Sequence, residues 1–504
     1  MHADLSHSGL SLPAGLYARL SGNCRQIGRS CRSRIRASHA LLSGIVLALT
    51  MSSPWALAGA PEGTPDESPL APLAEFHSEH GALTATLEAR DQQISIGRVV
   101  IEGSVYNGSY AGPVLRVQPG DWMYLHLVNH TARPTNLHFH GIDTSPLGNS
   151  DNMHIVVAPG SSYDYAVLIP RTQPPGLYWY HDHTHGVSRE NVMSGLSGAL
   201  VVEGFAAQFP ALRGTTEQLM VLKDYEFEES KDPYVTRVLH KLVQTINGQP
   251  FSSLRMSPGE TQLWRLVNQS ADNYFELSLQ GHAFRIIGED GSASQHETAA
   301  DRLLIKPASR LEVLVTAGAA GRYALISNGV LTGEGPDKAP FRQVGEVIVS
   351  GESRPSIARI GVFPAGVDLA GQAIDASRSV HFSQDSDAEI YRIDGKTFDH
   401  QRVDTRVPLG NIEEWTIFND TDDFHAFHIH QVSFQVTRIN DEVQPFNGRV
   451  DVVRVPEHGS VTLRMAFTDP VIVGRFMYHC HVLKHEDRGM MANIEVYDPR
   501  PPAP

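Results

Sequence analysis

Eight of the 25 histidines in this sequence form four pairs, and one residue separates the two members of each pair. The pairs are His138 and His140, His181 and His183, His428 and His430, and His479 and His481. Residues i and i+2 of a β-strand point to the same face, so each pair on a strand would present two imidazoles side by side. Imidazole is the commonest metal ligand in proteins. If the pairs converge, the eight imidazoles would form a buried metal centre.

A second set of potential metal ligands surrounds Cys480. His485 and Met490 follow this cysteine, and His425 lies three residues before the third histidine pair. On a strand, the Cys480 side chain points away from the face that carries its two histidine neighbours. Two His, one Cys and a more distant Met form a blue-copper electron-transfer site. The pattern therefore predicts two metal sites, with a short covalent electron path between them through Cys480.

Three related segments of the chain are expected to position these residues. The segments LHLVN, LWRLVN and EWTIFN end at Asn129, Asn268 and Asn419, and their alternating apolar and polar residues predict β-strands with one buried face. Histidine pairs begin nine residues after the first and third Asn, whereas Leu277 and Leu279 occupy these positions in the middle unit. The sequence therefore predicts three β-sandwich units, of which the middle one is a spacer without metal ligands.

Length and composition agree with three all-β units. The chain has 504 residues, enough for about three domains at roughly 100–200 residues each. It contains 43 Gly and 31 Pro, and its formal net charge is −15. This acidic balance argues against nucleic-acid binding, which requires a basic face. We expect domains at residues 79–205, 206–352 and 353–504.

The first 58 residues predict a secretory signal peptide. Several arginines precede an apolar run from Ala40 to Met51, and small residues follow in an A-x-A spacing that ends at Ala58. The apolar run is shorter than the roughly 20 residues of a membrane span, so we expect no stable membrane span in the mature chain. An uncleaved anchor is the alternative. Residues 59–78 predict a Pro-rich linker, and the mature chain is expected to be periplasmic or secreted.

With these motifs, the chain resembles the three-domain multicopper oxidases of the laccase-like group. The resemblance covers roughly residues 80–500. It rests on HFHG from His138, HDH from His181, HAFHIH from His425 and HCHVLKHEDRGM from His479. It implies an all-β fold of three consecutive cupredoxin-like Greek-key β-sandwich or barrel domains.

The resemblance also implies four copper ions: one of type 1, one of type 2 and two of type 3. The implied type 1 ligands are His425, Cys480, His485 and Met490. The implied type 2 ligands are His138 and His428. The implied type 3 ligands are His140, His181, His183, His430, His479 and His481. A small reducing substrate would give electrons singly to the type 1 copper, and the other three ions would reduce dioxygen to water.

Two carboxylates are candidates for supplying the protons that this reaction consumes. Glu486 directly follows His485, and the family often places an acid there. Asp151 lies eleven residues after His140, slightly further than is usual in the family. The alternative for both residues is a structural or solvated carboxylate.

The donor and the surroundings of the type 1 site are less determined. The first hypothesis is a laccase-like oxidase of phenols and aromatic amines. The second is a metallo-oxidase of Cu(I), Fe(II) or Mn(II), and the third is a copper chaperone or structural protein without turnover. The complete ligand set favours an enzyme. The sequence does not predict the oligomeric state.

We expect an edge of His485 to be exposed to donors and to have an acidic rim. The rim would consist of Asp420, Asp422, Asp423, Glu486 and Asp487. Such a rim could attract cationic donors. The alternative is a turn, in which Asp is favoured because it bonds to nearby backbone.

Overall fold

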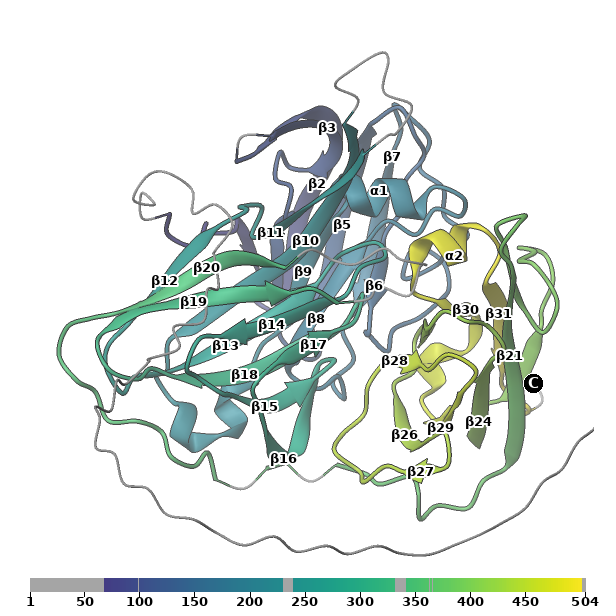
Figure 1. Ribbon diagram of the computed structural model, residues 1–504. Coiled ribbons are helices and arrows are strands. Elements are labelled where there is room, and N and C mark those ends of the chain that lie inside the picture. Colours follow the sequence, from purple (N-terminus) through teal and green to yellow (C-terminus); the bar gives the residue numbers. More distant parts are fainter. Residues whose placement is uncertain are drawn as a thin grey trace, which may run out of the picture. The chain divides into compact units, whose positions relative to one another are not determined.

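The computed structural model describes residues 68–97, 99–229, 239–330, 341–361, 363–364 and 366–500. Six β-sheets account for most of this part of the chain (Figure 1). The predicted signal peptide and residues 59–67 of the predicted linker lie outside the described residues. Among the helices that the structure does describe, none has the length and apolar character needed to cross a membrane.

The first unit consists of two sheets that pack face to face. One sheet has the order β3 (Val99–Tyr106), β2 (Ala82–Ile96), β5 (Trp122–His130) and β7 (Ser162–Leu168). The other has the order β1 (Glu75–His77), β4 (Val114–Val117), β9 (Ser197–Val202), β8 (Gly176–His181) and β6 (His138–His140). Side chains from both sheets form one apolar core. Helix α1 (Ser188–Ser194) lies between β8 and β9 in sequence, and η1 (Ala206–Gln208) and η2 (Pro210–Leu212) follow β9.

The second unit repeats this arrangement around its own core. Its larger sheet has the order β11 (Leu239–Ile246), β10 (Glu217–Glu229), β13 (Thr261–Asn268), β18 (Arg310–Thr316), β15 (Phe284–Glu289) and β16 (Ser292–Ala300). Its smaller sheet has the order β12 (Ser252–Met256), β20 (Arg342–Val349), β19 (Gly321–Asn328), β14 (Phe275–Leu279) and β17 (Leu303–Ile305). Leu277 and Leu279, at the positions of a histidine pair, belong to this core.

The third unit again has two sheets around one core. The first has the order β22 (Ile390–Ile393), β21 (Ala376–Asp385), β24 (Ile412–Asn419), β29 (Ser460–Ala466), β26 (Phe434–Ile439) and β27 (Glu442–Val443). The second has the order β23 (Thr405–Pro408), β31 (Met491–Tyr497), β30 (Gly474–Cys480), β25 (His425–Ile429) and β28 (Val452–Val455). Helix η3 (Pro470–Ile472) precedes β30, and α2 (Leu483–Asp487) follows it. The fold is therefore all-β, with three cupredoxin-like units as predicted.

The asparagine that ends each repeated segment has the same structural role in all three units. Asn129, Asn268 and Asn419 are buried at the ends of β5, β13 and β24. Each side-chain amide donates hydrogen bonds to backbone carbonyls, and each side-chain oxygen accepts one from the backbone N–H two residues later. These hydrogen bonds hold the end of each strand against a neighbouring loop. In the first and third units, the chain continues from this strand end to the first histidine pair of the same unit.

The histidine pairs lie on adjacent strands, as the alternation of side chains predicts. His138 on β6 is opposite His181 on β8, and His428 on β25 is opposite His479 on β30. Two neighbouring antiparallel strands thus bring together the imidazoles of each unit.

The end of the predicted linker is part of the fold. The backbone N–H of Leu70 donates to the carbonyl of Ser253 at 3.1 Å, and β1 pairs in parallel with β4. Residues that we expected to connect elements thus add an edge strand to the first unit.

Replacing Asn268 by Ala is expected to destabilise the protein without involving a predicted copper ligand. The change leaves the carbonyls of Asn273 and Ile305 without this donor. Each unsatisfied buried group costs about 1–3 kcal/mol. Denaturant unfolding measures the loss. Asn149→Ala is the control, because Asn149 is exposed and makes one long contact. Equal denaturant midpoints for the two variants would contradict the structural role of Asn268.

Candidate metal centre

Eight imidazoles from the first and third units converge on one buried site. All eight side chains are at most 2% exposed. The ring centroids of neighbouring imidazoles are 3.8–5.9 Å apart. Two pairs of rings stack across the boundary between the units at 3.8 Å: His138 on His430, and His140 on His428. The four predicted pairs therefore meet as one cluster.

Contacts around the cluster fix the orientation of the imidazoles. His138 Nδ1 lies 3.1 Å from both carboxylate oxygens of Asp151. Backbone carbonyls bond to Nδ1 of His181 and His428 at 2.8 and 2.7 Å. The Nε2 atoms of these three residues have no hydrogen-bond partner among the described residues. Outer partners of this kind orient metal-binding histidines in known sites.

The protonation state of the cluster suits a metal ion. Burial lowers the pKa of every imidazole for which a shift is resolved, to about 3 for His181 and about 4 for His183. The Nε2 atom of His479 lies 3.3 Å from that of His183 and 3.2 Å from that of His430. Neutral imidazole is the form that binds metals, and a cation between the lone pairs of these nitrogens would remove their repulsion. The residues present therefore fit copper.

The second predicted site forms on the opposite side of β30. The Cys480 sulfur lies 3.5 Å from Nδ1 of His425 and 3.7 Å from Nδ1 of His485, and these two nitrogens are 3.0 Å apart. Met490 is fully buried in the same core cluster as Cys480. Two imidazole nitrogens, a thiolate sulfur and a nearby thioether are the donors that blue-copper sites use.

The expectation that His485 presents an exposed edge is wrong. The side chain is 1% exposed, and the ring of Tyr391 stacks on it with a centroid distance of 4.1 Å and an interplanar angle of 18°. The hairpin of β21 and β22 lies against the end of α2, where the N–H of Tyr391 donates a hydrogen bond to the carbonyl of Arg488. This contact joins segments far apart in sequence, so no local pattern could have predicted it.

The expected acidic rim is also not formed as predicted. Glu486 is fully buried beside the imidazole cluster. Asp487 turns toward the first unit, where it accepts hydrogen bonds from the backbone N–H groups of residues 186, 188 and 189. Asp420 and Asp422 are exposed in the turn after Asn419, which agrees with the alternative explanation that Asp is favoured in turns.

Both candidate proton carriers contact imidazoles of the cluster. Glu486 Oε2 lies 2.9 Å from His479 Nδ1, and Oε1 lies 3.7 Å from His183 Nε2. Burial alone would raise the pKa of Glu486, but these two imidazoles outweigh it and lower the pKa to about 2. Burial raises the pKa of Asp151 well above its usual range, although the N–H of Phe139 donates to this carboxylate. The two carboxylates differ in their preferred protonation state.

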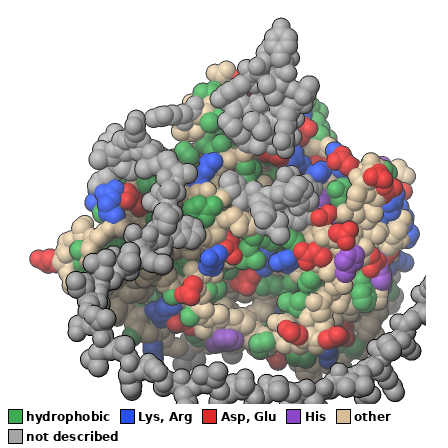
Figure 2. All heavy atoms as spheres, viewed as in Figure 1, with side chains coloured by type: hydrophobic (Ala, Val, Ile, Leu, Met, Phe, Trp, Pro, Cys, Tyr) green, Lys and Arg blue, Asp and Glu red, His purple; other side chains and the backbone are tan. Residues whose placement is uncertain are grey.

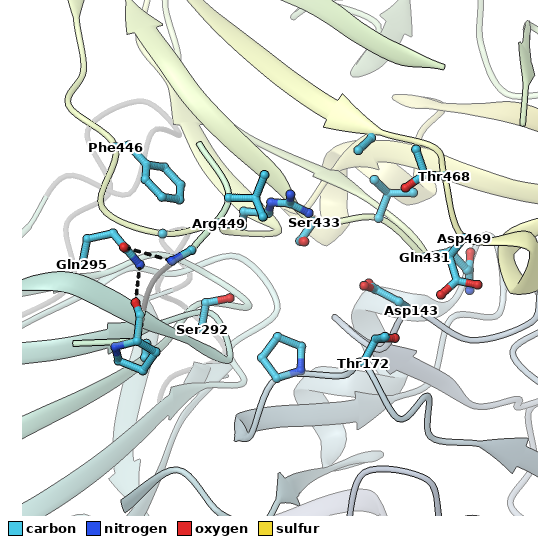
Figure 3. Close-up of a pocket in the computed structure, with 18 of the residues that line it drawn as sticks. Asp143, Thr172, Ser292, Gln295, Gln431, Ser433, Phe446, Arg449, Thr468 and Asp469 are labelled. Atoms are coloured by element: carbon cyan, nitrogen blue, oxygen red, sulfur yellow. Dashed lines mark hydrogen bonds between the residues drawn. The ribbon is translucent and has the colours of Figure 1, made fainter. Parts of the chain in front are cut away.

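A polar cavity adjoins Asp151 through a residue that the sequence did not single out. Gln431 donates a hydrogen bond to Asp151 and also lines a cavity of about 500 Å³ where residues of all three units meet. Asp143, Gln431 and Asp469 lie together at one end of it (Figure 3). Burial raises the pKa of Asp143 to about 7, against the opposing effect of Arg449. Polar groups thus lead from this cavity to His138.

The middle unit is more than a spacer, because Arg310 on β18 reaches the cluster. Its guanidinium forms two hydrogen bonds of 2.6 Å to the carboxylate of Asp451, and Nη1 lies 3.4 Å from Nδ1 of His140. The backbone carbonyl of the same aspartate orients His428. Among the described residues, the second unit supplies no imidazole to the cluster, yet it fixes one side of it.

Comparisons with known proteins identify the family of this chain. Three sequence profiles described as multicopper oxidase match residues 88–206, 221–346 and 373–500. The multicopper oxidase mco of Staphylococcus haemolyticus is 25% identical over 408 residues, covering 78% of this chain and 83% of the relative. The laccase of Bacillus subtilis is 23% identical, with 78% and 90% covered. A solved multicopper oxidase from Campylobacter jejuni, titled a metallo-oxidase, has a TM-score of 0.72 at 24% identity and covers 86% of this chain and 96% of its own.

The chain belongs to the multicopper oxidase family. It is therefore a copper-dependent oxidoreductase with dioxygen as electron acceptor. The comparisons give no support to a copper chaperone without turnover.

Replacing Cys480 by Ser is expected to abolish the blue absorption and turnover, because a hydroxyl is a poor soft ligand. Absorption spectroscopy with copper analysis tests this. The imidazole cluster should still hold copper, so the copper content should fall by one ion per chain. Cys480→Ser protein that remains blue would refute the assignment of this site.

Replacing Arg310 by Met is expected to destabilise the copper-free protein. The change leaves the buried carboxylate of Asp451 without its partner, which costs about 3–5 kcal/mol in comparable buried pairs. The control is Arg302→Met, which breaks an exposed ion pair with Glu276 and should cost less than about 1 kcal/mol. Similar denaturant midpoints for the two variants would show that Arg310 does not support the cluster.

Proposed function

We propose that this protein couples one-electron oxidation of phenolic or aromatic amine donors to four-electron reduction of dioxygen to water. When bound, one copper of type 1, one of type 2 and two of type 3 would supply the four one-electron steps. The proposal rests on the alternating direction of the side chains at residues 479–481, where β30 ends. Cys480 points to one site, and its two histidine neighbours point to the other.

The residues of the chain would divide the work between the two sites. Cys480, His425 and His485 would form the electron-accepting side, and the polypeptide through Cys480 would connect it to the imidazole cluster. We infer that Asp151 stores a proton, because burial favours its neutral form. Glu486, whose carboxylate lies 2.9 Å from His479 Nδ1, would pass protons toward the cluster. Gln431 would connect Asp151 with the cavity.

A second candidate donor class is a metal ion: Cu(I), Fe(II) or Mn(II). The burial of His485 under Tyr391 favours it, since a metal ion can give up an electron without stacking on the imidazole. Acidic side chains on the third unit also gather on the face shown in Figure 2. One structural neighbour is titled a metallo-oxidase, and one relative is named a laccase, so their names support both classes.

We also propose that the mature protein works outside the cytoplasm, in the periplasm or as a secreted protein. The support is the layout of residues 1–58, with arginines, a short apolar run and a small-residue site. N-terminal sequencing of the exported protein would show cleavage near Ala58, whereas an intact N-terminus would indicate an anchor.

The donor class can be tested by comparing kcat/KM for a methoxyphenol with kcat/KM for Cu(I), Fe(II) and Mn(II) under the same conditions. We expect the phenol to be preferred by about tenfold or more, or about 1.4 kcal/mol of transition-state stabilisation. A metal ion that is oxidised far more efficiently than the phenol would replace the first proposal by the second.

Asp151→Asn and Glu486→Gln are expected to slow dioxygen reduction while the blue absorption remains. General acid–base groups typically contribute about 10²–10⁴-fold to a rate. Stopped-flow mixing of fully reduced protein with dioxygen measures reoxidation directly. Glu276→Gln is the control, because that carboxylate pairs with Arg302 away from the cluster. Reoxidation of both test variants at the wild-type rate at every pH would exclude the proton role.

A further inference from the structure

Every residue of the predicted type 1 ligand set is shut off from solvent. His425, Cys480 and Met490 are 0% exposed and His485 is 1% exposed. Tyr391, which stacks on His485, is 6% exposed. Because electron transfer weakens steeply with distance, a donor in solution needs a group that shortens its path to the ligands. The Tyr391 ring is in van der Waals contact with a ligand on one face and is the more exposed of the two rings.

The other ligand imidazole offers no comparable entry. His425 is covered by the ring of Phe382, at a centroid distance of 5.5 Å and an angle of 84°, and Phe382 itself is 0% exposed. The Nε2 atom of His425 lies 2.9 Å from the hydroxyl oxygen of Thr421. The rings that cover the two imidazoles therefore differ in exposure, since Phe382 is 0% exposed and Tyr391 is 6% exposed.

The position of Tyr391 is fixed by its backbone and by the hairpin that carries it. Its N–H donates to the carbonyl of Arg488 at 3.2 Å. Two residues earlier in the chain, Glu389 forms ion pairs with Arg488 and Lys484. Gly489 has φ +113°, and a Cβ there would lie 2.8 Å from the carbonyl oxygen of Tyr391. The hairpin and the end of α2 thus fit closely, which holds the ring parallel to His485.

We propose that Tyr391 determines which donors the type 1 site accepts. Donors dock on the outer side of Tyr391, and the electron crosses its ring to His485, while flat aromatic donors are kept from stacking on the imidazole. The donor loses one electron and the type 1 copper gains it; Tyr391 keeps its proton and is not oxidised. This inference rests on the proposed function, since it concerns electron entry at the Cys480 site.

The test compares two neutral donors of different thickness. 2,6-Dimethoxyphenol is flat, whereas ferrocenemethanol is two rings thick and cannot enter a slot one ring wide. Anaerobic stopped-flow bleaching of the blue absorption gives the rate of electron entry without turnover. Tyr391→Phe keeps the stacked ring, so both rates should stay within about twofold of wild type. Tyr391→Ala opens the slot, so the ratio of the phenol rate to the ferrocenemethanol rate should rise by about tenfold or more.

A second readout does not depend on donors. The apolar shell around a copper site controls water access and thereby its reduction potential. Water admitted by Tyr391→Ala stabilises the more highly charged Cu(II), so the potential should fall, whereas Tyr391→Phe should leave it unchanged. If the Ala variant does not fold, Tyr391→Leu keeps apolar bulk without the ring and should slow ferrocenemethanol by about fivefold or more.

Phe382→Leu is the matched control, because it alters the ring on His425 without opening His485. Its donor ratio should equal that of wild type. An unchanged ratio and potential in Tyr391→Ala, or an unchanged ferrocenemethanol rate in Tyr391→Leu, would overturn the role of Tyr391. Wild-type protein whose blue absorption neither donor bleaches would instead refute the proposed function, so the two failures are distinguishable.

Discussion

The rest of the structure depends on holding eight imidazoles against one another in a space closed to bulk solvent. Packed at 3.8–5.9 Å between ring centroids, they leave five Nε2 atoms with no hydrogen-bond partner among the described residues. Buried polar groups in this state are costly unless a ligand satisfies them. Contacts around the cluster hold the imidazoles in place. Carboxylates and carbonyls bond to their outer nitrogens, and Arg310 bonds to Asp451. The first and third units supply the imidazoles and the second unit supplies the arginine, so the cluster needs all three.

The second constraint is the alternation of side chains along one strand. At Cys480 the chain places a thiolate among the two imidazoles of one site while the residues on either side of it belong to the other. No separate connection between the sites is needed. Both sites lie in buried cores, and the ring of Tyr391 covers His485. Under the role that we propose for Tyr391, the choice of donor depends on what covers the ligands as well as on the ligands themselves.

The sequence predicted those features that are local or repeated. Alternation predicted the strands, spacing placed the histidine pairs on one face, and comparison of the units explained why Leu277 and Leu279 replace histidines. What it missed depends on contacts between distant segments. Tyr391 covers His485 because a hairpin folds over α2, and Arg310 lies in the unit without histidines. Glu486 was placed on a surface rim as well as among proton carriers, and its burial excludes the rim.

The most direct test of this account is a crystal structure of the copper-loaded protein with anomalous scattering measured at the copper edge. The account predicts one anomalous peak bounded by His425, Cys480 and His485, and three peaks among the eight imidazoles. A single peak at Cys480, with none among the imidazoles, would contradict the central claim that the cluster is a copper centre for dioxygen reduction.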